Sequence, residues 1–278
     1  MSLLISIYGK GGIGKSTITS NLSISFAKKG KKVLQVGCDP KHDSTFPITH
    51  SMILTTIEVL KQHDFHEEEV TLKDIVFTGY MGVDCVEAGG PPAGTGCAGY
   101  VIGETIKLLE NLSAYENYDI VLFDVLGDVV CGGFSVPLQY SQRAMVVATD
   151  DFDSLFAANR IINGIYEKSH MYPVRLSGII GNRYAKKGRV EKFAEEIKTS
   201  VITNVPHSED IKSARVSGKS IYELYEMEPE KHALFSCFDK ITDYILNDCL
   251  KEKEPVCGLS DREMFERYKE NINDKLSK

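Results

Sequence analysis

The chain has 278 residues, 42% of them hydrophobic, and a formal net charge of −7 at pH 7. The length suits one large α/β domain, and the acidic balance argues against general nucleic-acid binding. No run reaches the roughly 18 apolar residues of a membrane-spanning helix, and the chain begins on a strand-like apolar run, so we expect no membrane span and no signal or transit peptide. Seven cysteines, an odd number, favour a reducing compartment.

An apolar run, a glycine-rich loop and a helical pattern follow one another at the N-terminus. Residues 3–8 predict a buried strand and residues 18–28 a helix. Residues 9–17 between them have the G-x-x-x-x-G-K-S spacing of a P-loop, whose backbone amides hold phosphate oxygens. Lys15 is expected to reach the β- and γ-phosphates of ATP, and Ser16 to bind Mg²⁺. The predicted phosphate-binding residues are Gly12, Ile13, Gly14, Lys15, Ser16 and Thr17.

The position of Lys10 indicates which class of P-loop this chain contains. It follows the first glycine, which gives the pattern K-G-G-x-G-K. This pattern resembles the variant P-loop of dimeric ATPases, in which the early lysine reaches across the interface to the partner's nucleotide. The resemblance implies a homodimer that closes over two ATP molecules, with Lys10 as a catalytic residue.

A second strand, predicted over residues 33–37, leads into an acidic loop. Asp39 and Asp43 lie where the carboxyl end of a parallel strand meets a ligand. They are expected to orient the attacking water and to contact the Mg²⁺ shell. The spacing alone leaves an ordinary acidic turn open.

The middle of the chain predicts helix at 51–62, a short element at 71–77 and a strand at 83–88, with Cys85 in the interior. Residues 89–100 are too rich in glycine and proline for a helix or regular strand, so the sulfur of Cys97 is expected to be exposed. A helix is predicted to resume at 101–112.

Residues 119–124 predict the clearest strand, and it ends in a carboxylate. Asp124 occupies the Walker B position, where it would hold Mg²⁺ through water. The segment after it is a candidate switch, with Asp128 as a relay toward Cys131, seven residues beyond Asp124.

The rest of the chain predicts strands at 144–149, 176–181 and 200–205, a helix at 153–168 and helix beyond 226. Asn182 and Arg183 follow a strand and are expected to hold the adenine, although plain turn residues remain an alternative. The predicted fold is a single-domain α/β P-loop NTPase over residues 1–250, with a mostly parallel sheet flanked by helices. A charged tail over 251–278 is expected to lie outside the core.

Cys97 and Cys131 are both flanked by glycines at strand ends on the nucleotide side. A [4Fe–4S] cluster needs four thiolates, and this chain has no C-x-x-C-x-x-C run. Two chains related by a two-fold axis would supply four cysteines, so one cluster shared by a homodimer is one reading. Buried or uncoordinated thiols remain the other.

Residues 9–17, 37–46, 87–103 and 123–134 are similar to the nitrogenase iron protein family. Within it the chain most resembles the ATP-binding iron–sulfur subunits of light-independent protochlorophyllide reductases, over nearly its whole length. The resemblance implies that Cys97 and Cys131 bind the cluster, and that Lys10 and Lys41 touch nucleotide across or near the dimer interface. Tyr100 departs from nitrogenase iron proteins, which usually carry a docking arginine there.

The resemblance also implies a function. Reduced ferredoxin would load an electron onto the cluster, and MgATP would drive docking on a heterotetrameric catalytic component that reduces protochlorophyllide. The expected compartment is the plastid stroma or the bacterial cytoplasm. The rivals are the reductase component of nitrogenase or of chlorophyllide reductase and, in another class, a partitioning or division-site ATPase, which would need a basic surface or an amphipathic membrane tail.

Overall fold

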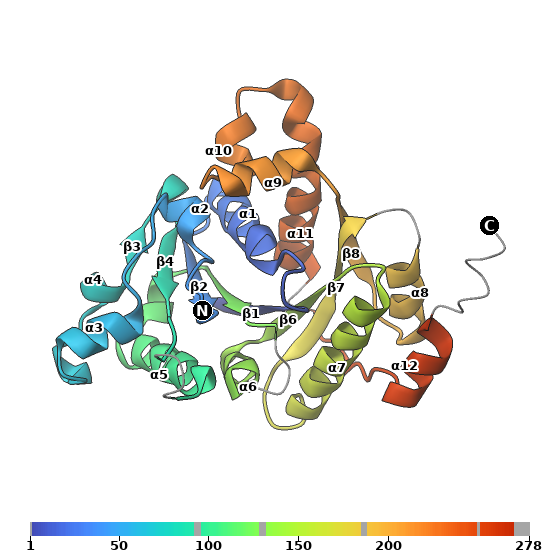
Figure 1. Cartoon of the computed structure of the whole chain (residues 1–278), viewed down its shortest axis with the longest axis horizontal. Coiled ribbons are helices and arrows are strands. Elements are labelled where there is room, and N and C mark those ends of the chain that lie inside the picture. The colour runs from blue at the N-terminus through green and yellow to red at the C-terminus, as the bar shows by residue number, and fades with distance from the viewer. Residues whose placement is uncertain (1, 92–95, 128–131, 185–187, 249–250, 270–278) are drawn as a thin grey trace.

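The computed structural model describes residues 2–91, 96–127, 132–184, 188–248 and 251–269. Within these ranges one sheet of eight strands lies between two layers of helices (Figure 1). The strand order is β3-β4-β2-β5-β1-β6-β7-β8, and every neighbouring pair is parallel except β3 with β4. The predicted α/β fold with a mostly parallel sheet is confirmed. The strands are β1 (Leu3–Tyr8), β2 (Val33–Cys38), β3 (Phe77–Thr78), β4 (Asp84–Glu87), β5 (Ile120–Val125), β6 (Arg143–Ala148), β7 (Arg175–Tyr184) and β8 (Val201–Pro206).

The helices divide between the two faces of the sheet. One layer holds α1 (Lys15–Lys28), α2 (Phe46–Thr49), α9 (Glu209–Val216), α10 (Ile221–Tyr225) and α11 (Phe235–Asp248). The other holds α3 (Thr56–Gln62), α4 (Leu72–Ile75), α5 (Ala98–Asn111), α6 (Gly132–Tyr140), α7 (Phe152–Lys168), α8 (Arg189–Glu196) and α12 (Asp261–Tyr268). Short 3₁₀ turns span Glu67–Glu69, Tyr80–Gly82, Ala114–Asn117 and Pro229–Leu234.

The alternation of side chains along β5 explains how one strand serves both layers. Ile120 and Leu122 pack in the core on the α1 side, whereas Val121 and Phe123 pack in the core on the other side. Successive side chains of a strand point to opposite faces, so Asp124 belongs to the α1 face. The buried central strand therefore delivers a carboxylate to the end of the sheet where α1 begins.

The elements predicted from apolar runs were found, with different ends in places. The helix expected over 51–62 begins only at Thr56, because Thr55 caps it through a capping box with Glu58. Helices α6, α8, α9 and α10 were not predicted. Each is short, and α6 contains Pro137, which weakens a helical pattern.

The expectation that the segment after residue 250 lies outside the core is wrong for its described part. Met264 and Tyr268 of α12 are buried in the core that α7 also lines, and Asn159 of α7 donates a hydrogen bond to the carbonyl of Leu259 at 2.8 Å. The high charge of the segment hides two apolar residues one helical turn apart, which fix α12 to the sheet. The domain boundary predicted at residue 250 stays a prediction.

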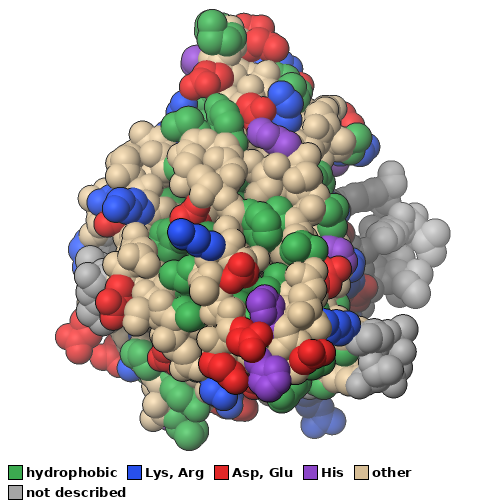
Figure 2. All heavy atoms as spheres, turned by 90° about the vertical axis from the view of Figure 1, so that its left-hand side faces the viewer, with side chains coloured by type: hydrophobic (Ala, Val, Ile, Leu, Met, Phe, Trp, Pro, Cys, Tyr) green, Lys and Arg blue, Asp and Glu red, His purple; other side chains and the backbone are tan. Residues whose placement is uncertain are grey.

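The surface beside β3, α3 and α4 carries mixed charges. Figure 2 shows acidic, basic and histidine side chains interspersed there with scattered hydrophobic ones. Two of the histidines pair with glutamates, His63 with Glu69 and His66 with Glu68. Among the helices of the described ranges, none is long and apolar enough to cross a membrane.

Candidate functional site

A cavity of about 710 Å³ lies where the P-loop enters α1. Gly14 has φ of +102°, and a Cβ there would lie 2.6 Å from the side-chain nitrogen of Asn182. Only glycine suits both the left-handed backbone and this close approach. The lining includes most of the predicted nucleotide-binding residues, namely Gly12, Gly14, Lys15, Ser16, Thr17, Asp39, Lys41, Asp43, Asn182 and Arg183.

Asn182 and Arg183 contact the P-loop itself. The Asn182 amide donates to the carbonyl of Ile13 at 2.6 Å, and the Arg183 guanidinium donates to the carbonyl of Gly12 at 3.0 Å. Both bonds fix the loop from the end of β7. The predicted contact of these two residues with adenine stays a prediction, and the structure adds a role in holding the loop.

Lys15 is a buried cation at the cavity wall. Its ammonium donates to the carbonyl of Lys10 at 3.3 Å. Burial lowers the pKa of Lys15, and the carboxylates of Asp124 and Asp39 partly oppose that shift. A buried ammonium gains most when an anionic ligand arrives, which suits the binding of a polyphosphate.

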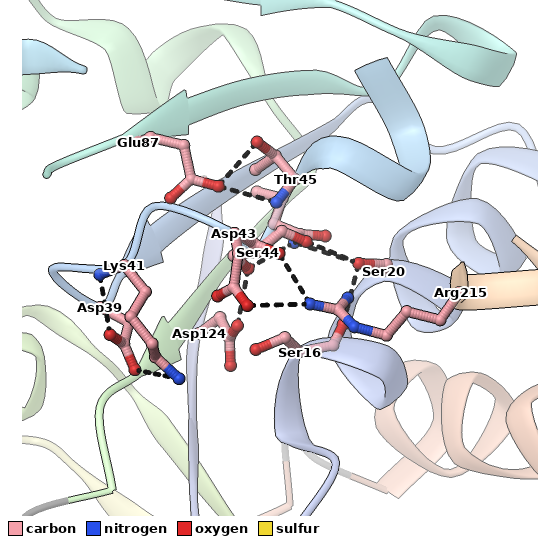
Figure 3. Close-up of polar contacts among 11 residues, drawn as sticks. Ser16, Ser20, Asp39, Lys41, Asp43, Ser44, Thr45, Glu87, Asp124 and Arg215 are labelled. Carbon is pink, nitrogen blue, oxygen red and sulfur yellow. Dashed lines mark hydrogen bonds and ion pairs between the residues drawn. The ribbon is translucent and has the colours of Figure 1, made fainter. Parts of the chain in front are cut away.

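Asp124 is buried at the centre of a hydrogen-bond network. The Ser44 hydroxyl donates to one of its oxygens at 2.6 Å, and Ser20 donates to the Ser44 carbonyl at 2.9 Å (Figure 3). Gln35 of β2 also donates to Ser44. Burial raises the pKa of Asp124, whereas the charge of Lys15 and the hydrogen bonds from Ser16 and Ser44 favour its ionised form. The network links β5, α1 and the acidic loop in one chain of contacts.

The acidic loop after β2 is held at several points. The amide of Lys41 donates to a carboxylate oxygen of Asp39 at 3.0 Å, and its ammonium lies 3.5 Å from the other oxygen. Asp43 pairs with Arg215 of α9, at 3.4 Å between the charged atoms. Both predicted acidic residues line the cavity, so the geometry is compatible with the proposed roles at Mg²⁺ and water.

Glu87 holds the far side of this loop and was missed from sequence. One of its oxygens accepts hydrogen bonds from the amide and the hydroxyl of Thr45, both at 2.7 Å. Its other oxygen is buried without a partner among the described residues. Burial raises the pKa of Glu87 to about 7. Gly37 leaves the space, because a Cβ there would lie 1.9 Å from that oxygen.

The wall of the cavity opposite the P-loop was also missed. It comes from the end of β8 and from α9, and includes Pro206, His207, Ser208, Ile211, Lys212, Arg215 and Val216. The local signal was present but weak. Ser208 accepts a hydrogen bond as the N-cap of α9, and Glu209 and Asp210 follow it in the first turn.

Lys10 lies outside the cavity lining. Its ammonium is 3.2 Å from Asp153 of α7, and both side chains are largely exposed. The lysine is therefore accessible on the surface beside the P-loop. Its predicted reach across a dimer interface stays a prediction.

Cys97 is exposed and occupies the N-cap position of α5. A helix N-terminus favours a thiolate, the form that binds iron. Cys38, Cys85 and Cys237 are buried, and burial raises the pKa of each thiol, so they are poorly suited as ligands. Cys131 and Asp128 lie outside the described residues.

The described residues of one chain contain no group of three or more His, Cys, Asp or Glu that could hold a metal ion. Cys97, the one predicted cluster ligand among the described residues, is exposed, and its role at a cluster stays a prediction.

Comparison with known proteins identifies the family. Residues 3–270 match the family model described as 4Fe-4S iron sulfur cluster binding proteins, NifH/frxC family. The chain belongs to this family. It is 51% identical over 271 residues to the light-independent protochlorophyllide reductase iron-sulfur ATP-binding protein of Chlorobium phaeobacteroides, covering 96% of this chain and 98% of that protein. The protein of the same name from Pelodictyon phaeoclathratiforme is 50% identical, covering 95% and 98%.

Solved structures confirm the fold and nothing finer. The cell division ATPase MinD of Pyrococcus furiosus superposes with a TM-score of 0.67 at 21% identity, covering 88% of this chain and 99% of that one. The fold is therefore shared with the division-site ATPases named above as a rival. The family membership separates this chain from them.

Proposed function

We propose that the chain is the ATP-driven electron donor of a light-independent protochlorophyllide reductase. The observation that carries this proposal is the identity of about half of all residues, over nearly the full length of both chains, to relatives of that name. The family model supports the bound [4Fe–4S] cluster, and the P-loop cavity supports the use of MgATP.

The residues of this chain would act on ATP by position and charge, without a protein nucleophile. The P-loop amides and Lys15 would bind the phosphates, and Ser16 and Asp124 would hold Mg²⁺, Asp124 through water. Asp39 and Asp43 would orient the attacking water. Lys41 would touch the nucleotide from the rim, and Lys10 of a second chain would stabilise the developing charge, as an arginine finger does.

The cysteines would serve the electron transfer. Cys97 and Cys131 of two chains would hold one [4Fe–4S] cluster per homodimer, and when bound it supplies a one-electron store. The electron would come from ferredoxin and pass to a heterotetrameric catalytic component that binds protochlorophyllide. The two relatives named above come from bacteria, which supports the bacterial cytoplasm over the plastid stroma.

The experiment that tests this function pairs the anaerobically purified protein with the catalytic component of the Chlorobium phaeobacteroides system. With MgATP and reduced ferredoxin we expect protochlorophyllide to be reduced, and the Lys15→Ala variant to be inactive because it lacks the phosphate-binding cation. Parallel assays with the catalytic components of nitrogenase and of chlorophyllide reductase distinguish the proposed partner from these two rivals. Turnover only with one of these would replace the proposal, and a cluster-free protein inactive with all three would favour a partitioning ATPase.

A further inference from the structure

Arg215 connects α9 with the acidic loop after β2. It lies in the last turn of α9, and its guanidinium donates to the backbone carbonyl of Asp43 at 2.8 Å and lies 3.4 Å from the Asp43 carboxylate. The guanidinium also stacks 4.7 Å from the centre of the Phe46 ring. Three contacts with one loop, from a helix more than 160 residues away in sequence, hold the guanidinium in one orientation.

The carboxylate of Asp43 already faces the phosphate end of the site. In Figure 3 it points toward the end of the cavity where Asp124 and Ser16 lie, while Arg215 reaches it from the other side. The charges of Asp43 and Lys15 influence each other, as do those of Arg215 and Asp124. Arg215 therefore restrains Asp43 from the α9 part of the cavity lining.

We propose that Arg215 is a positioning residue that holds Asp43 in place for ATP hydrolysis and links it to the α9 wall of the cavity. The inference rests on the proposed use of ATP and assigns the α9 side a part in it. A carboxylate that orients water needs a fixed direction, and loop 39–46 has no regular structure before α2 to fix it. One terminal nitrogen of Arg215 contacts both the carbonyl and the carboxylate of Asp43, and the planar guanidinium, anchored on a helix and stacked on Phe46, supplies that direction.

The contact between Arg215 and Asp43 also joins two parts of the cavity lining. Residues of the P-loop and residues of α9 both line the cavity. A nucleotide that reaches from the P-loop to α9 would contact both parts of the lining, and Arg215 joins α9 to Asp43. One nitrogen of Arg215 is buried without a hydrogen-bond partner among the described residues, so the guanidinium retains a donor for a small adjustment on binding.

The test is steady-state ATP hydrolysis by the cluster-loaded homodimer, with MgATP binding measured separately by calorimetry. We expect Arg215→Gln to lower kcat at least about tenfold while the Kd for MgATP changes less than about threefold. Arg215→Lys keeps the charge but loses the planar group that stacks on Phe46, so it should recover only part of kcat. Lys219→Gln is the matched control, because Lys219 is a nearby cation that pairs with Glu223 outside the cavity.

A double-mutant cycle with Asp43→Asn separates positioning from a general structural loss. If Arg215 acts through Asp43, the double variant should lose no more than Asp43→Asn alone. Fully additive losses, or unchanged kcat in Arg215→Gln, would overturn the inference. So would a rise in kcat, which would mean that Arg215 restrains Asp43 from acting. A wild-type protein that binds or hydrolyses no ATP would instead contradict the proposed function, so the two failures are distinguishable.

Discussion

The nucleotide end and the cysteine end of this molecule are built in different ways. Around the P-loop, a single chain brings α1, β2, β5 and α9 into one network, in which Asp124, Ser44 and Asp43 all have partners. Around Cys97, the described part of the chain offers one exposed thiol at the start of α5. Under the proposed function, ATP binding would be a property of each chain, whereas the cluster would be a property of the pair.

Replacing Cys97 gives the largest expected effect. It tests most directly whether the cluster and the nucleotide site are separate. In the homodimer Cys97→Ser removes two of the four proposed thiolate ligands of the shared cluster, so we expect the purified dimer to lose essentially all its iron and its visible colour. MgATP binding should stay within about threefold of wild type, because the P-loop network is separate. Cys257→Ser, an exposed thiol beside Asn163, is the control and should keep its iron.

Replacing Lys10 tests the nucleotide end of the molecule. Lys10→Ala should retain the cluster but lose ATP-driven electron transfer, because the charge from across the interface would be missing from the transition state. The measurements are iron content and ATP-dependent reduction by the catalytic partner. Asp153→Asn removes only the partner of Lys10 within the chain and should keep most of the activity. Unchanged turnover in Lys10→Ala would make the lysine a surface residue of the loop.

Replacing Asp128 tests whether MgATP binding at the nucleotide end changes the accessibility of the cluster. The seven residues from Asp124 to Cys131 span at most about 25 Å, so a shift of the Mg²⁺-side backbone is expected to reach the cluster loop. We predict that MgATP speeds removal of iron by a chelator in the wild type. Asp128→Asn should still bind ATP but lose that acceleration. Equal chelation rates in the wild type with and without MgATP would show that the segment is no switch.

Glu87 gives the smallest expected effect and sharpens the account of the nucleotide end. Its pKa is raised from 4.5 to about 7 by burial, with the charges of Asp124 and Asp43 adding to the shift. Between these pH values the folded protein retains a proton that the unfolded chain has released, so the free energy of unfolding falls as pH rises, by up to about 3 kcal/mol.

The measurement is urea unfolding of Glu87→Gln at several pH values between 4.5 and 7.5. Glutamine resembles the protonated glutamate, so the variant should lose most of this pH dependence while still accepting the hydrogen bonds of Thr45. Glu116→Gln, on an exposed turn, should keep the wild-type profile. A Glu87 variant with the full wild-type slope would place the titration elsewhere.

The sequence predicted those parts of the site that local patterns encode. The strand, glycine loop and helix around Lys15 and the apolar run before Asp124 depend on neighbours within a few residues. Arg215 and Glu87 could not be predicted in the same way, because their partners Asp43 and Thr45 lie 172 and 42 residues away. The burial of Met264 and Tyr268 was missed for a different reason, because charged neighbours conceal these two apolar positions.

The most direct test of the central claim is a count of iron and nucleotide in the same anaerobically purified dimer. Colorimetric iron analysis and equilibrium dialysis with MgATP would be carried out on one preparation of known oligomeric state. We predict four irons and two nucleotides per dimer, because each chain carries a complete P-loop site but only half of the cluster ligands. Eight irons per dimer, or iron retained in a stable monomer, would contradict the account.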